Sequence, residues 1–248
     1  MKLPLIQSRV LVSYVPLALM ALIFLPFHKA DANRFGPAWT AADPQILYGS
    51  GIDFDVYRRG DKVGFHSVQF VRTEEHFAVT SSFQLQIDIL FFTVYRYAYL
   101  SESRWRNGRL LHLKADVNDN GTTLSIEATH ESSGGMKIMS PDGNLTVDTH
   151  LFPTDHWNAE VLGETSVLNT LTGRLNNVRI VPKERTVVST ELGDVAATRY
   201  AYTGDLDTEV WYDDAGRWVK MRFKGRDNSI IEYVCRRCQG SAAKQVDQ

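Results

Sequence analysis

The chain has few of the residues on which metal and redox sites are built. Only two of its 248 residues are cysteine. Its seven histidines are scattered, and no pair has the H-x-x-x-H or H-E-x-x-H spacing of helical zinc ligands. One C-x-x-C pair is half of a four-cysteine zinc site, and no second half is present. The sequence therefore predicts neither a metal nor a cofactor.

Signatures of nucleotide-binding and acyl-transfer enzymes are absent too. The chain contains no P-loop, no G-x-G-x-x-G turn and no G-x-S-x-G nucleophile elbow. Its net charge is −2 with histidine neutral, and no basic stripe or tail indicates nucleic-acid binding. We therefore expect no nucleic-acid partner, and we favour a non-catalytic protein over an enzyme.

The two cysteines, Cys235 and Cys238, leave three interpretations open. The favoured one is a local disulfide, which an exported protein permits. In a continuous strand their Cα atoms would lie ~10 Å apart, so a disulfide requires a turn after Val234. Free thiols are the second interpretation. A redox or metal site is the third, but the helix N-terminus that a thioredoxin-like site needs is missing.

The beginning of the chain has the three parts of a secretory signal peptide. A basic start is followed by an apolar, uncharged run over residues 10–27 and by an A-x-A cleavage pattern ending at Ala32. We expect residues 1–32 to be removed and the mature protein to be periplasmic. An uncleaved membrane anchor is the alternative, and two prolines in the run disfavour it. No later run is apolar for 18 residues, so the mature form is expected not to span a membrane.

Alternation of apolar and polar residues dominates the rest of the chain. Its longest clean example covers residues 77–89, and Asn107-Gly108 between β-type residues is a strong hairpin signal. Residues 33–51 read as an irregular lead-in, 52–234 as an all-β domain and 235–248 as a tail. One short helix is plausible at 151–162, and two β halves would meet near 150–162. Short turns between long strands predict a curved antiparallel meander, half-barrel or barrel-like, with at most one or two short helices.

A hairpin at residues 210–223 shows the same pattern, with an Asp-Asp-Ala-Gly turn between two β-type runs. Alternation assigns the side chains of its second strand to two faces: Val219, Met221 and Phe223 on the core side, and Trp218, Lys220 and Arg222 on the other. If that second face is open, a ring beside two cations would suit an amphiphile with an anionic head. A solvated face is the alternative.

Large aromatic side chains are abundant, and residues 90–99 are apolar on both faces of the expected strand. A concave sheet lined by such rings would form a cavity for a lipid or another apolar small molecule. The alternative is that the rings are simply the core. The candidate ligand-binding residues are Phe83, Leu85, Phe91, Tyr95, Tyr97, Trp105, Trp157, Trp211, Trp218 and Arg222.

The densest group of acids and imidazoles comprises Asp148, His150, Asp155 and His156. Such a group would supply a general base, and Asp155 and His156 are the weak catalytic candidates of an envelope enzyme. The favoured alternative is that residues 155–158 cap and pack a short helix. A third possible role for the protein is that of a structural module that binds a partner through an exposed sheet edge.

Several stretches resemble an uncharacterised family of exported bacterial proteins with a domain of unknown function. The similar stretches are 54–64, 95–97, 153–158, 172–174 and 204–233. They are turn-forming and packing motifs, so the resemblance implies a fold and no activity. More distantly, the layout is similar to periplasmic lipoprotein-carrier folds, in which a curved antiparallel sheet cradles a lipid chain. The pair Cys235 and Cys238 lies beyond the similar region.

Overall fold

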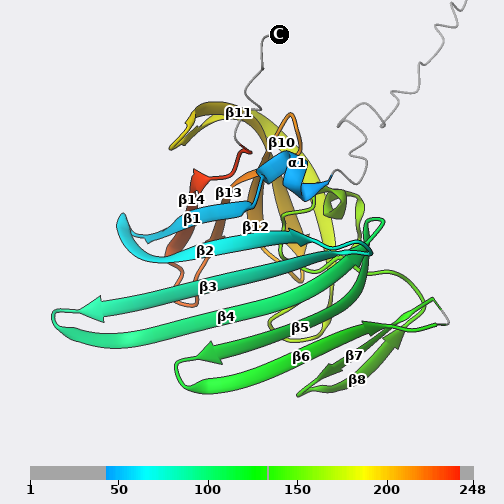
Figure 1. Cartoon of the computed structure of the whole chain (residues 1–248). Helices are drawn as coiled ribbons and strands as arrows, with labels where there is room; N and C mark the ends of the chain where they lie inside the picture. The colour runs from blue at the N-terminus through cyan, green and yellow to red at the C-terminus, as the bar shows by residue number, and fades with distance from the viewer. Residues whose placement is uncertain (1–42, 133, 241–248) are drawn as a thin grey trace, which may run out of the picture. The chain divides into compact units, whose positions relative to one another are not determined.

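The computed structural model describes residues 43–132 and 134–240 (Figure 1). The expected signal peptide, the first part of the lead-in and the last eight residues lie outside this range. The described residues form one sheet with an α-helix, α1 (Pro44–Tyr48), and a 3-10 turn, η1 (Ala159–Gly163). No helix among them is both long and apolar enough to cross a membrane.

The sheet has fourteen strands in the described part of the chain. The first eight are β1 (Gly51–Arg58), β2 (Asp61–Arg72), β3 (Phe77–Ile89), β4 (Phe92–Arg106), β5 (Arg109–Asp119), β6 (Thr122–His130), β7 (Met136–Ser140) and β8 (Gly143–Val147). The other six are β9 (Ser166–Leu168), β10 (Leu175–Thr190), β11 (Gly193–Gly204), β12 (Thr208–Asp213), β13 (Trp218–Lys224) and β14 (Ile230–Arg237).

Strands that follow each other in the chain are neighbours in the sheet, except for β8 and β9. Their order is β8-β7-β6-β5-β4-β3-β2-β1-β14-β13-β12-β11-β10-β9, so two meanders join where β1 pairs with β14. All these pairs are antiparallel, as short hairpin turns require. In the β4–β5 turn, Asn107 and Gly108 both have positive φ, which is the geometry that Asn-Gly favours. The predicted antiparallel meander is confirmed.

The two edge strands, β8 and β9, are not hydrogen-bonded to each other, yet side chains link the two ends of the sheet. Arg174, before β10, forms an ion pair with Asp142 in the β7–β8 turn at 2.7 Å. A Cβ atom on Gly173 would lie only 2.5 Å from the Cβ of Ser140. Because the sheet curls until its ends touch without pairing, it resembles a barrel that side chains close.

The interior is filled with aromatic rings rather than left hollow. Trp218 is fully buried, and its ring centroid lies 4.4 Å from that of Phe54 and 5.4 Å from that of His66. A second group joins Trp105 to Trp157 at 5.1 Å. Each large apolar side chain removed from water contributes roughly 1.5–3 kcal/mol, so these clusters are a main source of stability.

Two segments differ from the sequence-based expectation. Residues 44–48 form α1 within the stretch expected to be irregular, with Asp43 as its N-cap accepting a hydrogen bond from the Gln45 amide at 2.9 Å. The helix expected at 151–162 is only the turn η1. His156 has φ of 54°, a left-handed conformation that a right-handed helix cannot include, so helical geometry starts after it.

A β-bulge changes the faces of the 210–223 hairpin. Trp211 pairs with Lys220 but Tyr212 pairs with Trp218, which leaves one extra residue, Val219, on β13. The extra residue turns Trp218 to the interior face, whereas Arg222 donates a hydrogen bond to Glu209 at 2.8 Å. The expectation that Trp218 shares a face with Lys220 and Arg222 is therefore wrong.

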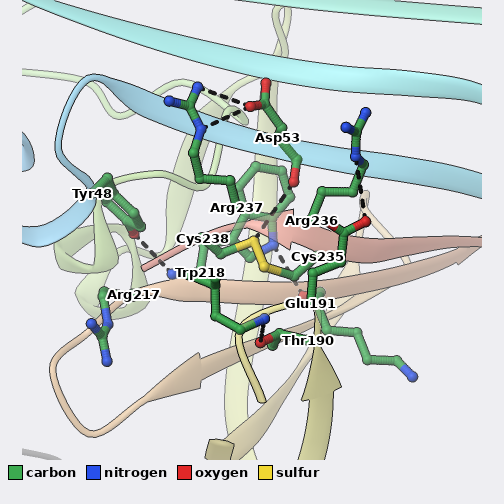
Figure 2. Close-up of a disulfide and its surroundings, with 12 residues drawn as sticks. Tyr48, Asp53, Thr190, Glu191, Arg217, Trp218, Cys235, Arg236, Arg237 and Cys238 are labelled. Carbon is green, nitrogen blue, oxygen red and sulfur yellow. Dashed lines mark hydrogen bonds and ion pairs between the residues drawn. A yellow bond between two sulfur atoms is a disulfide. The ribbon is translucent and has the colours of Figure 1, made fainter. Parts of the chain in front are cut away.

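The cysteines are joined by a disulfide at the end of β14, with a Cα–Cα distance of 5.8 Å (Figure 2). The expected turn after Val234 is not present, because β14 continues through Arg237. Instead, a register shift against β1 at Asp53/Phe54 shortens the distance between the two cysteines. Arg237 forms an ion pair with Asp53 at 2.8 Å. This ion pair ties the end of the last strand to β1.

Candidate functional site

Seven strand-connecting segments lie at one end of the described sheet because β1, β3, β5, β7, β9, β11 and β13 run in the same direction. We call this the hairpin end, formed by residues 59–60, 90–91, 120–121, 141–142, 169–174, 205–207 and 225–229. Ion pairs join several of these turns. Asp227 pairs with Arg58 and Arg59, and Asp142 pairs with Arg174.

One ion pair crosses the inner face of the sheet. Arg226, in the β13–β14 turn, lies 2.7 Å from Asp119 at the end of β5, although several strands separate β5 from β13 in the sheet. Tyr95 donates a hydrogen bond to the same carboxylate at 2.8 Å. Desolvation, with the hydrogen bond to Asp119, raises the pKa of Tyr95 to about 12, so its hydroxyl remains a donor at neutral pH.

Beneath this ion pair the apolar interior reaches the surface. The side chains of Ile87, Tyr95, Tyr97 and Phe223, which we call the mouth patch, are half-buried and pack against the core. The ring of Tyr97 lies 5.8 Å from that of Phe83, and the ring of Phe223 lies 6.0 Å from that of Tyr233. The patch therefore continues the central ring cluster to solvent.

This arrangement has the chemistry of an amphiphile site. A mostly apolar surface with a few convergent polar groups is typical of small-molecule sites. The guanidinium of Arg226 is well exposed and would pair with a carboxylate or phosphate through charge-assisted hydrogen bonds.

The structure places the ten predicted ligand-binding residues in different environments. Six are buried in the interior: Phe83, Leu85, Trp105, Trp157, Trp211 and Trp218. Tyr95 and Tyr97 belong to the mouth patch, and Phe91 is exposed in the β3–β4 turn. Arg222 is held by Glu209. Only Phe83, Leu85, Tyr95 and Tyr97 lie together near the mouth.

Sequence reasoning missed four residues of this site: Ile87, Asp119, Phe223 and Arg226. Ile87 was visible only as one member of an alternating strand. Phe223 had been assigned to the core. Arg226 looked like an ordinary turn residue, because nothing local connects it to Asp119, which is more than a hundred residues earlier in the chain. Contacts across the curled sheet have no signal in a single sequence.

The predicted group of acids and imidazoles is divided between surface and interior. Asp148 and His150 are exposed, whereas Asp155 and His156 are buried. Asp155 accepts a hydrogen bond from the Trp157 indole at 3.1 Å, and burial raises its pKa to about 7. Burial lowers the pKa of His156 to about 4. Among the described residues no cluster of His, Cys, Asp and Glu is arranged to hold a metal ion.

A buried pair, His66 and Ser81, also escaped sequence reasoning. The His66 Nε2 and Ser81 Oγ atoms are 2.9 Å apart. Burial, and then the neighbouring His156, lowers the pKa of His66 to about 3. Rings of Phe54, Phe83 and Trp218 pack around the imidazole. A nucleophile and its base must be within reach of the substrate, whereas the surrounding side chains separate this pair from solvent.

A shallow trough of about 480 Å³ lies across β2 to β5. Its side chains include Phe65, Gln84, Gln86, Arg96, Asn118 and Asn120. Gln86 and Asn118 already bond within the protein, to Asp88 and to the Gly121 amide. Apolar residues such as Val63, Leu85 and Tyr97 line the trough as well, so its surface is mixed, and it shares Tyr97 with the mouth patch.

Comparison with known proteins identifies the family of this chain. A family described as a domain of unknown function, DUF6134, matches residues 54–236. The chain belongs to the DUF6134 family. The resemblance to an uncharacterised β-rich family is thereby confirmed, and the match also includes Cys235, which sequence reasoning placed outside the similar region. No curated protein matches this DUF6134 chain.

A solved structure extends the comparison to the fold. The chain is similar to a "Beta-barrel-like Protein of Domain of Unknown Function DUF1849 from Brucella abortus", with 12% sequence identity and a TM-score of 0.56. The similarity covers 78% of this chain and 98% of that one. At this identity the likeness concerns the fold alone, and it agrees with the curled, nearly closed sheet of the DUF6134 chain.

Proposed function

We propose that this DUF6134 protein is exported to the periplasm and binds an amphiphile, without catalysis, at the hairpin end. The observation that carries the proposal is the mouth patch. Four half-buried apolar and aromatic side chains continue the central ring cluster to the surface, directly beside the Asp119–Arg226 ion pair. Apolar surface beside a cation is complementary to an acyl chain that ends in an anionic head.

In this proposal the acyl chain lies along Ile87, Tyr97 and Phe223. Arg226 exchanges Asp119 for the anionic head, and Tyr95 keeps its hydrogen bond to Asp119. Because Arg226 is well exposed and Asp119 keeps the hydrogen bond from Tyr95, the exchange costs less than breaking a fully buried ion pair would. The ion pair would therefore cover the empty site without blocking entry.

The interior itself is not proposed as the cavity. Buried rings such as Trp105 and Trp218 occupy the inner face, so a ligand would extend the core at its open end rather than fill a hollow. The buried rings of the interior support the mouth patch from below. The ring of Tyr233 stacks on that of Phe83 at 5.7 Å and contacts that of Phe223.

Export is supported by the signal-peptide pattern of residues 1–32 and by the Cys235–Cys238 disulfide, which suits an oxidising compartment. The test is fractionation of cells followed by N-terminal sequencing. We expect periplasmic protein that begins at Asn33. Cytoplasmic protein that retains its first 32 residues would contradict this part.

Binding is tested with a lysophospholipid held below its critical micelle concentration, so that only monomers are present. We expect Ile87→Asp to weaken binding at least tenfold, because it places a charge where the acyl chain would lie. The matched control is Val187→Asp on β10, where the replaced side chain is well exposed and distant in sequence from the mouth. We expect Arg226→Ala to reduce affinity for an anionic head more than for a zwitterionic one. Equal affinity of Ile87→Asp and Val187→Asp would refute the proposed site.

A further inference from the structure

The β3–β4 hairpin extends beyond both neighbouring strands (Figure 1). Pairing of β3 with β2 ends at Leu85 opposite Gly64. Pairing of β4 with β5 ends at Tyr97 opposite Asp119. Beyond Arg96, whose carbonyl still accepts a hydrogen bond from the Asn120 amide, residues 86–95 form a two-stranded ribbon whose strands pair only with each other. The ribbon is therefore a projection, whereas the rest of β3 and β4 lies inside the sheet.

The tip of this ribbon is apolar and exposed. Residues 89–95 contain no charge. Leu90, Phe91 and Phe92 are 86%, 96% and 72% exposed, and they adjoin the exposed Ile89 and Val94. A contiguous group of large exposed apolar side chains marks an interaction site in a soluble domain.

The backbone conformation of the β3–β4 turn is one that apolar residues such as leucine rarely adopt. Leu90 has φ of 57°, in the left-handed region that costs an ordinary L-residue roughly 1–2 kcal/mol. Glycine or asparagine would fit there with less strain, as Asn107, Asn120 and Asn228 do in other turns of this chain. The turn thus holds a bulky apolar side chain in solvent at a position that sterically favours a small or polar residue.

We propose that residues 89–94, the tip of the β3–β4 hairpin, insert into the interfacial region of a lipid bilayer. A bilayer fits this shape better than a protein partner does. The tip is convex and one hairpin wide, so a protein would need a matching deep pocket, whereas lipids rearrange around an inserted side chain. A stable protein interface also requires about 800 Å² on each partner, in a broad and complementary patch.

Hydrogen bonding sets the depth of insertion. The ribbon satisfies its inner backbone groups by its own pairing, as at Ile87–Tyr95 and Ile89–Phe92. Its outer edges have no strand partner, and such groups are not tolerated in hydrocarbon but are satisfied by water and headgroups. The tip therefore reaches the headgroup and upper acyl region, with Tyr95 at the boundary where aromatic residues concentrate.

Charges near the tip predict little dependence on lipid charge. Asp88 and Arg96 flank the uncharged segment, and their charges cancel. Binding is therefore driven by apolar contact, and phosphatidylcholine alone should suffice. Insertion would also bring the mouth patch to the lipid surface. The membrane-insertion proposal goes beyond the proposed function, since a protein could dock on bilayers without binding an amphiphile at the mouth patch.

The test places an environment-sensitive NBD fluorophore on the tip of the full chain. Phe91→Cys is labelled and mixed with phosphatidylcholine vesicles; the two native cysteines are joined to each other and do not react. The matched control is Leu192→Cys in the β10–β11 turn at the opposite end, where the native side chain is 63% exposed. We expect a blue shift and at least a twofold rise in emission at position 91 and neither change at position 192. This readout is local, so it does not respond to other segments that touch the vesicle.

A second measurement uses unlabelled variants in vesicle flotation. We expect Leu90→Asn with Phe91→Ser to lower the partition coefficient at least tenfold, and Leu192→Ser to leave it unchanged. No spectral change at position 91, or equal losses in both variants, would overturn the proposal. Binding that requires phosphatidylglycerol and disappears in 0.5 M salt would overturn it too. Monomeric lysophospholipid separates the two proposals: the tip variant should bind it normally if only insertion depends on the tip.

Discussion

The buried residues His66, His156 and Asp155 should make the stability of this protein fall as the pH drops below about 6.5. Burial lowers the pKa of His66 to about 3 and that of His156 to about 4, and it raises the pKa of Asp155 to about 7. The three groups lie among other ionisable side chains, since the ring of Tyr202 meets that of His156 edge to face and the Tyr212 hydroxyl donates to the His156 carbonyl. None of these tyrosines titrates below neutral pH, because burial raises their pKa values.

The signs of the contributions differ. Below pH 6.5 the unfolded chain protonates both histidines while the folded protein does not, so each histidine lowers stability as the pH falls. Asp155 acts in the opposite direction, because between pH 3.8 and 7 the folded protein holds a proton that the unfolded chain has lost. One net proton is therefore taken up on unfolding between pH 6.5 and 4. At 1.36 kcal/mol per proton and pH unit, the loss over this range is about 3 kcal/mol.

Two variants separate these contributions. His156→Asn suits the left-handed backbone at this position and removes one histidine, so the free energy of unfolding should become nearly independent of pH between 4 and 6.5. Asp155→Asn removes the opposing group, so the loss should grow to about 7 kcal/mol. Urea denaturation followed by tryptophan fluorescence at pH 6.5, 5.5 and 4.5 measures both. Surface carboxylates contribute equally to all three proteins, so the differences between slopes are decisive. A His156→Asn slope equal to that of the native protein would refute the reasoning.

Three further predictions concern stability and use thermal or urea unfolding at pH 6.5. Tyr48→Phe should cost about 2–4 kcal/mol, because its hydroxyl accepts from one buried amide and donates to one buried carbonyl, and both would lose a partner. Gly64→Ala should prevent or severely weaken folding, since its Cβ would lie 2.0 Å from a carbonyl oxygen of β3, whereas Gly163→Ala, with open space around it, should change stability by less than about 1 kcal/mol. Replacing Cys235 and Cys238 together by serine should cost only about 2 kcal/mol, because the loop they close is short; a loss above 5 kcal/mol would contradict this.

Local patterns predicted the strands well, and long-range contacts account for what they missed. Alternation in β3 identified Phe83 and Leu85 as inward-facing, because the side-chain period of a strand depends only on the strand itself. The bulge at Val219 reversed the expected face of Trp218, since a single inserted residue shifts the period and leaves no mark in composition.

The candidate site was only partly predictable for the same reason. Tyr95 and Tyr97 stood out because their strand is apolar on both faces. Arg226 did not, because its importance depends on the curl of the sheet that brings it to Asp119. His66 is similar: it occupies an inward position of an ordinary strand, and only the folded structure shows its hydrogen bond to Ser81.

The measurement that tests the central claim most directly is photo-crosslinking with an amphiphile that carries a diazirine in its acyl chain. The labelled protein is digested and the modified peptides are identified by mass spectrometry. Our account predicts label on two segments, residues 83–97 and 221–233, which meet at the mouth patch. It also predicts that Ile87→Asp abolishes this labelling. Label confined to other strands, or label on these segments that Ile87→Asp leaves unchanged, would contradict the account.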